Sequence, residues 1–124
     1  MGKSLENIIS DLVALFRPYM DGINSVIDIG TGTSIPIHVF AGIFPDVTYM
    51  TADVADIRKK KKLPFFIYDG NVLPFRDLEF DVSLLNETLH HCKDPLSVLK
   101  EAGRVAGVVY VIEHFPEPGA SCCR

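Results

Sequence analysis

A short apolar run that ends in one acid and two glycines is the first place where this sequence could carry out chemistry. Residues 26–34 read VIDIGTGTS, so Gly30 and Gly32 follow Asp28 and are separated by a single residue. Glycine is used where a chain turns tightly or where its backbone must approach a ligand. A strand that leads into such a turn, with a helix beginning behind it, is typical of a nucleotide-cofactor site. We therefore expect a cofactor at residues 26–34.

Polar residues also follow each of the later apolar runs. They are Asp53, the segment 69–71, the segment 86–91 and the segment 113–114. Ligands of open α/β sheets bind outside the carboxyl ends of the strands, so we expect one cleft to collect these side chains. Asp53 lies 23 residues after Gly30, close to the spacing of roughly 20 at which an acid holds a pair of ribose hydroxyls. The pattern predicts a cofactor that contains a nucleoside.

The glycine spacing narrows the class of cofactor. A dinucleotide-binding loop requires a third glycine or alanine where this sequence has Ile35, whose side chain would obstruct the close packing of helix on strand. The sequence also lacks the Gly-x-x-x-x-Gly-Lys loop that binds the phosphates of ATP or GTP. Both observations disfavour dinucleotides and nucleoside triphosphates as the ligand.

The apolar periodicity predicts an α/β fold in which helices and strands alternate. We expect strands over 25–29, 47–52, 64–68, 80–85 and 108–112, and helices over 4–20, from Pro36, over 54–62 and from Asp94–Pro95. In the last helix, the predicted buried stripe is Leu96, Leu99, Ala102 and Val105. The β-branched run 108–112 predicts a strand that is buried on both faces. This alternation predicts an open parallel sheet with right-handed crossovers.

The length of 124 residues predicts a single domain. We divide it into an N-terminal helix over 1–20, a cofactor-binding core over 25–114 and a tail over 115–124. The net charge of −4 disfavours nucleic acid as the main partner, because phosphate binding usually requires a basic surface. We see neither a membrane span nor a secretory leader in the sequence, and its three cysteines, an odd number, suggest a reducing compartment. We therefore expect a cytoplasmic protein.

Five motifs, in this order, resemble those of the class I S-adenosylmethionine-dependent methyltransferases, and in particular the type 11 group. They are DIGTGTS at 28–34, ADV at 52–54, DGNVLPF at 69–75, FDVSLL at 80–85 and LHHCKDP at 89–95. The resemblance implies a Rossmann-like sheet of strand order 3-2-1-4-5 in three α/β/α layers. The sheet of that family continues with a further helix and two strands, which this sequence lacks. We therefore expect the edge of the fifth strand to pair with a second copy or a partner subunit.

The resemblance also implies a role for each matching residue in the first motif. Asp28, Gly30, Thr31 and Gly32 would line the methionine end of S-adenosylmethionine, with Asp28 near its ammonium group. A cationic cofactor of this kind needs acids and carbonyls rather than a cluster of cations.

The later motifs would contact the rest of the cofactor. The resemblance implies that Asp53 binds the ribose hydroxyls, with Val54 beside it. Asp69 would accept a hydrogen bond from the adenine amino group, and the backbone of Gly70 would lie beside the ring. Asn86 would lie near the sulfonium and the entering substrate.

His91 is the predicted general base, because an imidazole accepts protons near neutral pH. Asn86 is the second predicted catalytic residue. Metal binding is an alternative use of His90, His91, Cys92 and His114. These residues lack the C-x-x-C and H-x-x-x-H spacings of metal sites, so we expect packing of this turn and no metal.

The basic run Lys59–Lys62 closes the helix that is predicted over 54–62. Such a run suits contact with RNA or an acidic partner. It equally suits a solvated face in which cations lie favourably at the C-terminus of a helix. We expect the solvated face.

The motifs together predict an enzyme that transfers a methyl group from S-adenosylmethionine to an unidentified acceptor. A small molecule fits the acidic composition better than a nucleic acid does. The alternative is a methyltransferase-like domain without catalysis, which serves as a binding or regulatory subunit.

Overall fold

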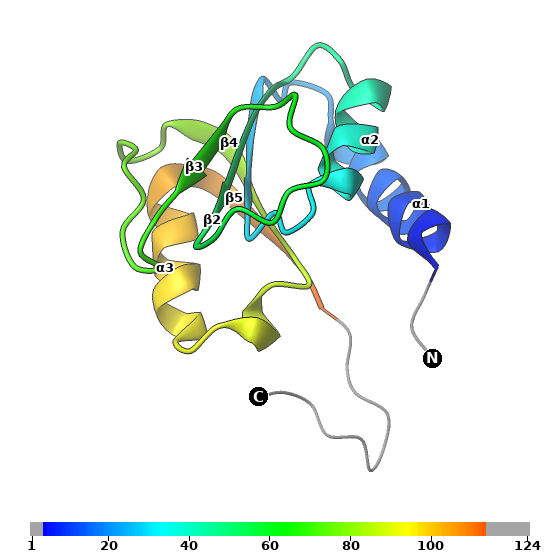
Figure 1. The fold of residues 1–124 in the computed structure, drawn as a ribbon. Coiled ribbons are helices and arrows are strands. Elements are labelled where there is room, and N and C mark those ends of the chain that lie inside the picture. The colour runs from blue at the N-terminus through cyan, green and yellow to red at the C-terminus, as the bar shows by residue number, and fades with distance from the viewer. Residues whose placement is uncertain (1–3, 114–124) are drawn as a thin grey trace.

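Figure 1 shows the fold of the protein, a computed structural model that describes residues 4–113 apart from the side chains of Leu5, Ile8 and Leu12. Five parallel strands form one sheet in the order β3-β2-β1-β4-β5. Their bounds are β1 Ser25–Ile29, β2 Thr48–Asp53, β3 Phe65–Ile67, β4 Phe80–Asn86 and β5 Ala106–Ile112. This order confirms the predicted Rossmann-like parallel sheet.

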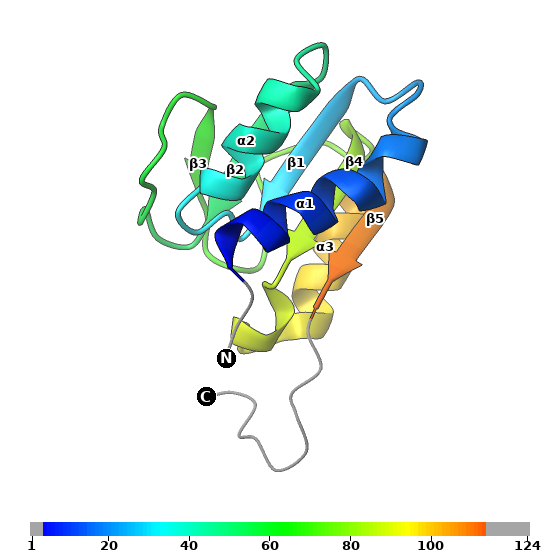
Figure 2. The same cartoon turned by 90° about the vertical axis from the view of Figure 1, so that its right-hand side faces the viewer.

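Helices lie on both faces of the sheet and complete three layers (Figure 2). One face is covered by α1 (Leu5–Phe16) and α2 (Ile35–Ile43), and the other by α3 (Pro95–Val105). The first core contains Phe16, Ile37, Phe40, Val26, Val82 and Leu84, and the second contains Val98, Ala102, Val105, Ile27, Ile29 and Leu85. Val26 and Ile27 belong to opposite cores because successive side chains of a strand point to opposite faces. The α/β/α prediction is confirmed.

Local signals in the sequence set the beginnings of two helices. The Oγ of Ser4 accepts a hydrogen bond from the N–H of Asn7 at 3.2 Å and caps α1. Asp94 caps α3 in the same way, and Pro95 occupies the first turn, as predicted. After α1 the chain tightens into the 3-10 turn η1 (Arg17–Tyr19), since Pro18 has no N–H with which to continue an α-helix.

The segment 54–62 is not the short helix that the sequence predicts. Between β2 and β3 the chain is irregular. The N–H of Val54 donates to Oδ1 of Asp53 at 2.7 Å, and the N–H of Lys59 donates to the carbonyl of Thr33 at 2.8 Å. In a helix over 54–62 the N–H of Lys59 would instead donate to the carbonyl of Ala55, four residues earlier, whereas the N–H of Val54, in the first turn, would have no such acceptor. The N–H of Lys59 cannot make both hydrogen bonds, and the one to Thr33, outside the segment, replaces the helical one.

Two predictions of burial are wrong in part. In α3, Leu96 is 61% exposed and Val98 is buried in its place, because Leu96 lies in the first turn and faces solvent. In β5, Val108 and Val111 are 46% and 43% exposed, although the sequence predicts burial on both faces. Within residues 4–113, β5 is the outermost strand next to β4, so its side chains have fewer neighbours than those of β1 and β4.

The predicted tail over 115–124 and His114 lie outside the described residues. None of the helices within residues 4–113 combines the length and apolar character needed to cross a membrane. A second 3-10 turn, η2 (Leu89–His91), lies between β4 and α3.

Candidate cofactor site

The glycine loop leaves β1 through a backbone that only certain residues adopt easily. Gly30, Gly32 and Ser34 have φ angles of 78°, 56° and 63°, all in the left-handed region. A Cβ placed on Gly30 would lie 2.4 Å from Cγ2 of Thr88, whereas one placed on Gly32 would meet nothing within 4 Å. Gly30 is therefore required by a contact within the protein as well as by its φ, and Gly32 is required by its φ alone.

Asp28 is a buried acid at the base of this loop. Its side chain is 6% exposed and accepts a hydrogen bond from the Oγ1 of Thr31 at 2.7 Å. The same Thr31 hydroxyl lies 2.6 Å from the hydroxyl of Ser34, which is fully buried. Burial raises the pKa of Asp28 to about 7, with a smaller rise from the charge of Asp53, although the Thr31 hydrogen bond acts in the opposite direction. A cation beside Asp28 would relieve this unfavourable burial of charge.

Asp53 joins the end of β2 to the glycine loop. Its Oδ2 accepts a hydrogen bond from the N–H of Gly32 at 2.9 Å, and its Oδ1 accepts one from the N–H of Val54 at 2.7 Å. The N–H groups of Gly30 and Thr31 both donate to the carbonyl of Ala52, at 2.8 and 3.1 Å. The predicted residues after β1 and β2 therefore lie together in one place.

Asp69 and Gly70 extend this surface toward β3. The Oδ1 of Asp69 accepts hydrogen bonds from the N–H groups of Asn71 and Val72, at 2.8 and 3.0 Å. These backbone hydrogen bonds lower the pKa of Asp69, with that from Val72 the stronger cause. A Cβ placed on Gly70 would lie 3.4 Å from Cγ1 of Val54, so the loops after β2 and β3 are in contact. Val54 is 57% exposed and offers an apolar surface beside the two acids.

The loop that contains Asp69 is held on α3 by one arginine. The guanidinium of Arg104 donates to the carbonyls of Leu73 and Phe75, at 2.9 and 2.8 Å. It also forms ion pairs with Glu101 at 2.6 Å and with Asp77 at 2.9 Å. The hydrogen bond from Arg104 lowers the pKa of Glu101. The sequence offered no signal for this anchor, because its partners in the loop, Leu73, Phe75 and Asp77, lie about 30 residues earlier in the chain.

The turn after β4 lies against the glycine loop. The Oγ1 of Thr88 donates to the carbonyl of Ile29 at 3.2 Å, which places the turn directly over the end of β1. Asn86, the last residue of β4, is partly buried, and its carbonyl lies 3.2 Å from the same Thr88 hydroxyl. His91 is exposed on η2, and its N–H donates to the carbonyl of Thr88 at 3.0 Å. Both predicted catalytic residues therefore lie at the carboxyl edge of the sheet, close to the glycine loop.

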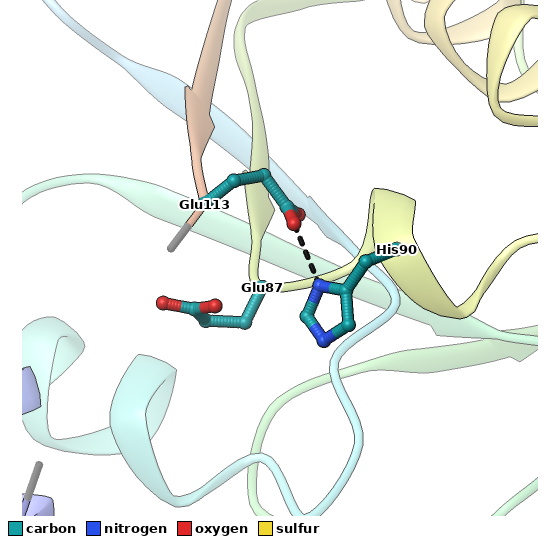
Figure 3. Close-up of side chains that lie close together, drawn as sticks. All are labelled: Glu87, His90 and Glu113. Atoms are coloured by element: carbon teal, nitrogen blue, oxygen red, sulfur yellow. Dashed lines mark hydrogen bonds and ion pairs between the residues drawn. The ribbon is translucent and has the colours of Figure 1, made fainter. Parts of the chain in front are cut away.

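Figure 3 shows the side chains of Glu87, which follows β4, of His90 on η2, and of Glu113, which follows β5. Their potential ligand atoms all lie within 4.8 Å of one another. The Nδ1 of His90 lies 2.6 Å from Oε1 of Glu113, and Oε2 of Glu113 accepts a hydrogen bond from the N–H of Leu89 at 2.9 Å. The sequence places Glu113 only at the end of a strand, and the pairing of Asn86 with Ile112 across β4 and β5 brings it to His90.

His38 is a further residue that the sequence did not single out. Its Nδ1 lies 2.6 Å from the carbonyl of Ser34, and its Nε2 accepts hydrogen bonds from the N–H groups of Lys62 and Leu63, at 3.0 and 3.1 Å. Since two donors face Nε2, Nδ1 carries the hydrogen and donates to Ser34. His38 therefore ties the end of the irregular segment to the glycine loop.

The run Lys59–Lys62 is exposed, as predicted for a solvated face, but it does not lie at the C-terminus of a helix. The expectation of a favourable helix dipole is therefore wrong, because the backbone of Lys59 is bonded to Thr33 instead. Contact of this run with RNA stays a prediction.

Comparison with known proteins was consistent across sequence and structure. The chain is 33% identical over 97 residues to an uncharacterised protein of Methanocaldococcus jannaschii, which covers 77% of this chain and 45% of that protein. A putative methyltransferase from Bacillus halodurans has a TM-score of 0.69 at 23% identity, over 87% of this chain and 53% of the other. A SAM-dependent methyltransferase from Aquifex aeolicus has a TM-score of 0.62 at 20% identity, over 95% and 79%.

The chain spans about half the length of the first two of these proteins. The structural similarities, at identities under a quarter, concern the fold. A family model described as a methyltransferase domain matches residues 27–111, which extend from β1 to β5 and include the glycine loop and the acids that follow β2 and β3. The chain therefore belongs to the type 11 methyltransferase-domain family and has the Rossmann-like fold of the class I enzymes.

Proposed function

We propose that this chain binds S-adenosylmethionine at the carboxyl edge of the sheet and transfers its methyl group to an acceptor at the ends of β4 and β5. The observation that carries the proposal is the convergence of two acids on the glycine loop. Asp53 accepts a hydrogen bond from Gly32, and the buried Asp28 lies beneath Thr31. These two carboxylates accept hydrogen bonds, so they suit a cofactor with cationic and hydroxyl groups better than one with phosphates, which would require N–H groups or cations.

The residues present fit such a cofactor. Asp28 is a buried carboxylate whose raised pKa would return toward its ordinary value beside an ammonium group. Asp53 would exchange its backbone donors, the N–H groups of Gly32 and Val54, for ribose hydroxyls. The exposed side chain of Val54 and the adjacent Gly70 would flank the adenine, with Asp69 at its rim.

S-adenosylmethionine supplies an electrophilic methyl group on a sulfonium, so the chain has mainly to hold a nucleophile in line with it. We place Asn86 at this position, because it ends β4 and contacts Thr88, which lies over Gly30. His91 on the same turn stays a candidate base. A small, uncharged or cationic acceptor is consistent with the net charge of −4. Pairing of the β5 edge with a second copy or a partner subunit also stays a prediction.

Calorimetric titration with S-adenosylmethionine and S-adenosylhomocysteine tests the proposal. We expect binding to the wild type, and a loss of about 1–3 kcal/mol in Asp53→Ala, because charged hydrogen-bond acceptors contribute this much. Asp46→Ala is the matched control, since Asp46 is an exposed acid just before the opposite end of β2. Absence of binding at millimolar ligand would refute the proposal. Binding without transfer to any acceptor would favour the alternative of a binding subunit without catalysis.

A further inference from the structure

We propose that His90 and Glu113 form a base dyad that removes the proton from an acceptor whose nucleophile is a hydroxyl or a thiol. The inference rests on the proposed methyl transfer and names the chemical class of its acceptor. The roles proposed above for Asn86 and for the cofactor residues are unchanged. The proton transfer, for which the sequence suggested His91, is assigned to His90.

The geometry of Glu113 fixes the state of the His90 ring. A carboxylate only accepts hydrogen bonds, so the 2.6 Å contact between Oε1 of Glu113 and Nδ1 of His90 places a hydrogen on Nδ1. The second oxygen of Glu113 is held by the N–H of Leu89 at 2.9 Å, which prevents the carboxylate from rotating away. Nε2 of a neutral His90 therefore keeps its lone pair and can accept a proton.

The pair combines access with shielding. The side chain of His90 is 37% exposed, so an acceptor can reach its ring, whereas that of Glu113 is only 24% exposed. Figure 3 shows Glu113 and His90 directed toward one another from the end of β5 and from η2. A partly shielded carboxylate stabilises an imidazolium more strongly than one in open water.

Two contacts hold the dyad at the carboxyl edge of the sheet, beside the glycine loop. The N–H of Glu87 donates to the carbonyl of Ile112 at 2.7 Å, which joins the turn to β5. Thr88 binds the end of β1, so the same turn also lies over the glycine loop. The turn that carries His90 is thus held between the glycine loop and β5, which Glu113 follows.

Two acids and one histidine face His90. Glu113 is in contact, the carboxylate of Glu87 lies within 4.8 Å of the potential ligand atoms of the pair, and the ring of His91 lies 4.0 Å away between centroids. We assign the base to His90 because its Nδ1 contacts Oε1 of Glu113, whereas the His91 side chain lies against the His90 ring.

The proposed step balances as follows. The acceptor oxygen or sulfur forms a bond to the methyl carbon, and the bond from that carbon to the sulfonium breaks with its electron pair kept by the departing sulfur. The O–H or S–H proton passes to Nε2 of His90, and the positive imidazolium is balanced by the Glu113 carboxylate. A tertiary amine carries no proton on its nucleophilic atom, so its methylation needs no such base.

The first test reads the tautomer of His90 by two-bond proton–nitrogen correlation in protein with isotope-labelled histidine. We expect hydrogen on Nδ1 in the wild type and its loss from Nδ1 in Glu113→Ala. Glu87→Ala is the matched control, because it removes a neighbouring carboxylate and leaves Glu113 in place. Hydrogen on Nε2 in the wild type, or a tautomer that Glu113→Ala leaves unchanged, would overturn the proposal. This readout needs neither cofactor nor acceptor.

The second test measures transfer of a tritiated methyl group to phenol, catechol and thiophenol, with N,N-dimethylaniline as an acceptor that has no proton to lose. We expect His90→Gln to lower kcat for the first three by about 10²–10⁴-fold, with KM for S-adenosylmethionine unchanged, and to leave transfer to dimethylaniline intact. Lys93→Ala, an exposed change three residues away, is the control variant and should leave all rates unchanged. Glu113→Gln checks that the charge of the dyad contributes.

The outcomes separate the dyad from the function on which it rests. Equal losses for all acceptors, undiminished rates in His90→Gln, or no transfer to any hydroxyl or thiol by a protein that binds S-adenosylhomocysteine would each overturn the dyad. A wild-type protein that fails to bind S-adenosylhomocysteine would instead refute the proposed function, and the catalytic role of His90 with it. The tautomer result would then still decide whether Glu113 orients His90.

Discussion

Replacing Asp28 by asparagine is expected to stabilise the protein at alkaline pH and to weaken cofactor binding. Asp28 is buried and has a pKa of about 7, against 3.8 for an ordinary aspartate. Between these two values the folded state keeps a proton that the unfolded state releases. The contribution of Asp28 to stability is therefore fully present below pH 3.8 and is lost as the pH rises toward 7.

The magnitude follows from the width of this window. Each pH unit within it changes the free energy of unfolding by about 1.4 kcal/mol. From pH 5 to pH 8, the wild type crosses about two units of the window. We therefore expect it to lose about 2–3 kcal/mol relative to Asp28→Asn, whose amide has no charge to bury.

Urea denaturation of both proteins at pH 5 and pH 8 measures this difference. Other titrating groups are common to the two proteins and cancel to first order when the two differences are compared. Asp46→Asn, at an exposed position, is the control and should shift the free energy of unfolding by less than about 0.5 kcal/mol at either pH. If the wild type gained stability relative to Asp28→Asn as the pH rose, the Thr31 hydrogen bond would outweigh burial and the reasoning would be refuted. On the proposed function, the same variant should bind S-adenosylhomocysteine about 10–100-fold more weakly, since it lacks the carboxylate near the ammonium group.

Two further predictions concern the supports of the site. Gly30→Ala should lower the free energy of unfolding by about 2–5 kcal/mol, because a φ of 78° is unfavourable for alanine and the new Cβ would clash with Thr88. Gly32→Ala should lower it by only about 1–2 kcal/mol, because only its φ is unfavourable. Denaturation midpoints check this order, and equal losses would contradict the contact with Thr88. Arg104→Ala should lower the free energy of unfolding by about 1–3 kcal/mol and increase amide hydrogen exchange over 69–76, because it removes the donors that hold the carbonyls of Leu73 and Phe75. Arg104→Lys should recover only part of this loss, since an ammonium cannot reproduce the planar fork of a guanidinium, and full recovery would show that charge alone anchors the loop.

The sequence predicts most of the fold because its signals are local. The buried run of β1, the glycines that follow it and the Asp94–Pro95 start of α3 depend on a few neighbouring residues. The order of the elements then leaves few ways to pair parallel strands with right-handed crossovers. The motifs placed the candidate cofactor residues in one region for the same reason, since the carboxyl ends of parallel strands share one edge of the sheet.

Contacts between segments that are distant in the sequence determine the features that the sequence did not predict. The segment 54–62 loses its predicted helix because Thr33 and His38, about 25 residues earlier, accept its N–H groups. Gly30 cannot carry a side chain because Thr88 packs on it from another strand end, a contact that no spacing in the sequence reveals.

The pairing of His90 with Glu113 shows the same limit at the site itself. It depends on the register in which Asn86 faces Ile112 across two strands. By itself, the sequence determined which residue types gather at the carboxyl edge, because composition and spacing act locally. Only the tertiary structure decided which of them touch, because hydrogen-bond partners are chosen by distance in space and not by distance along the chain.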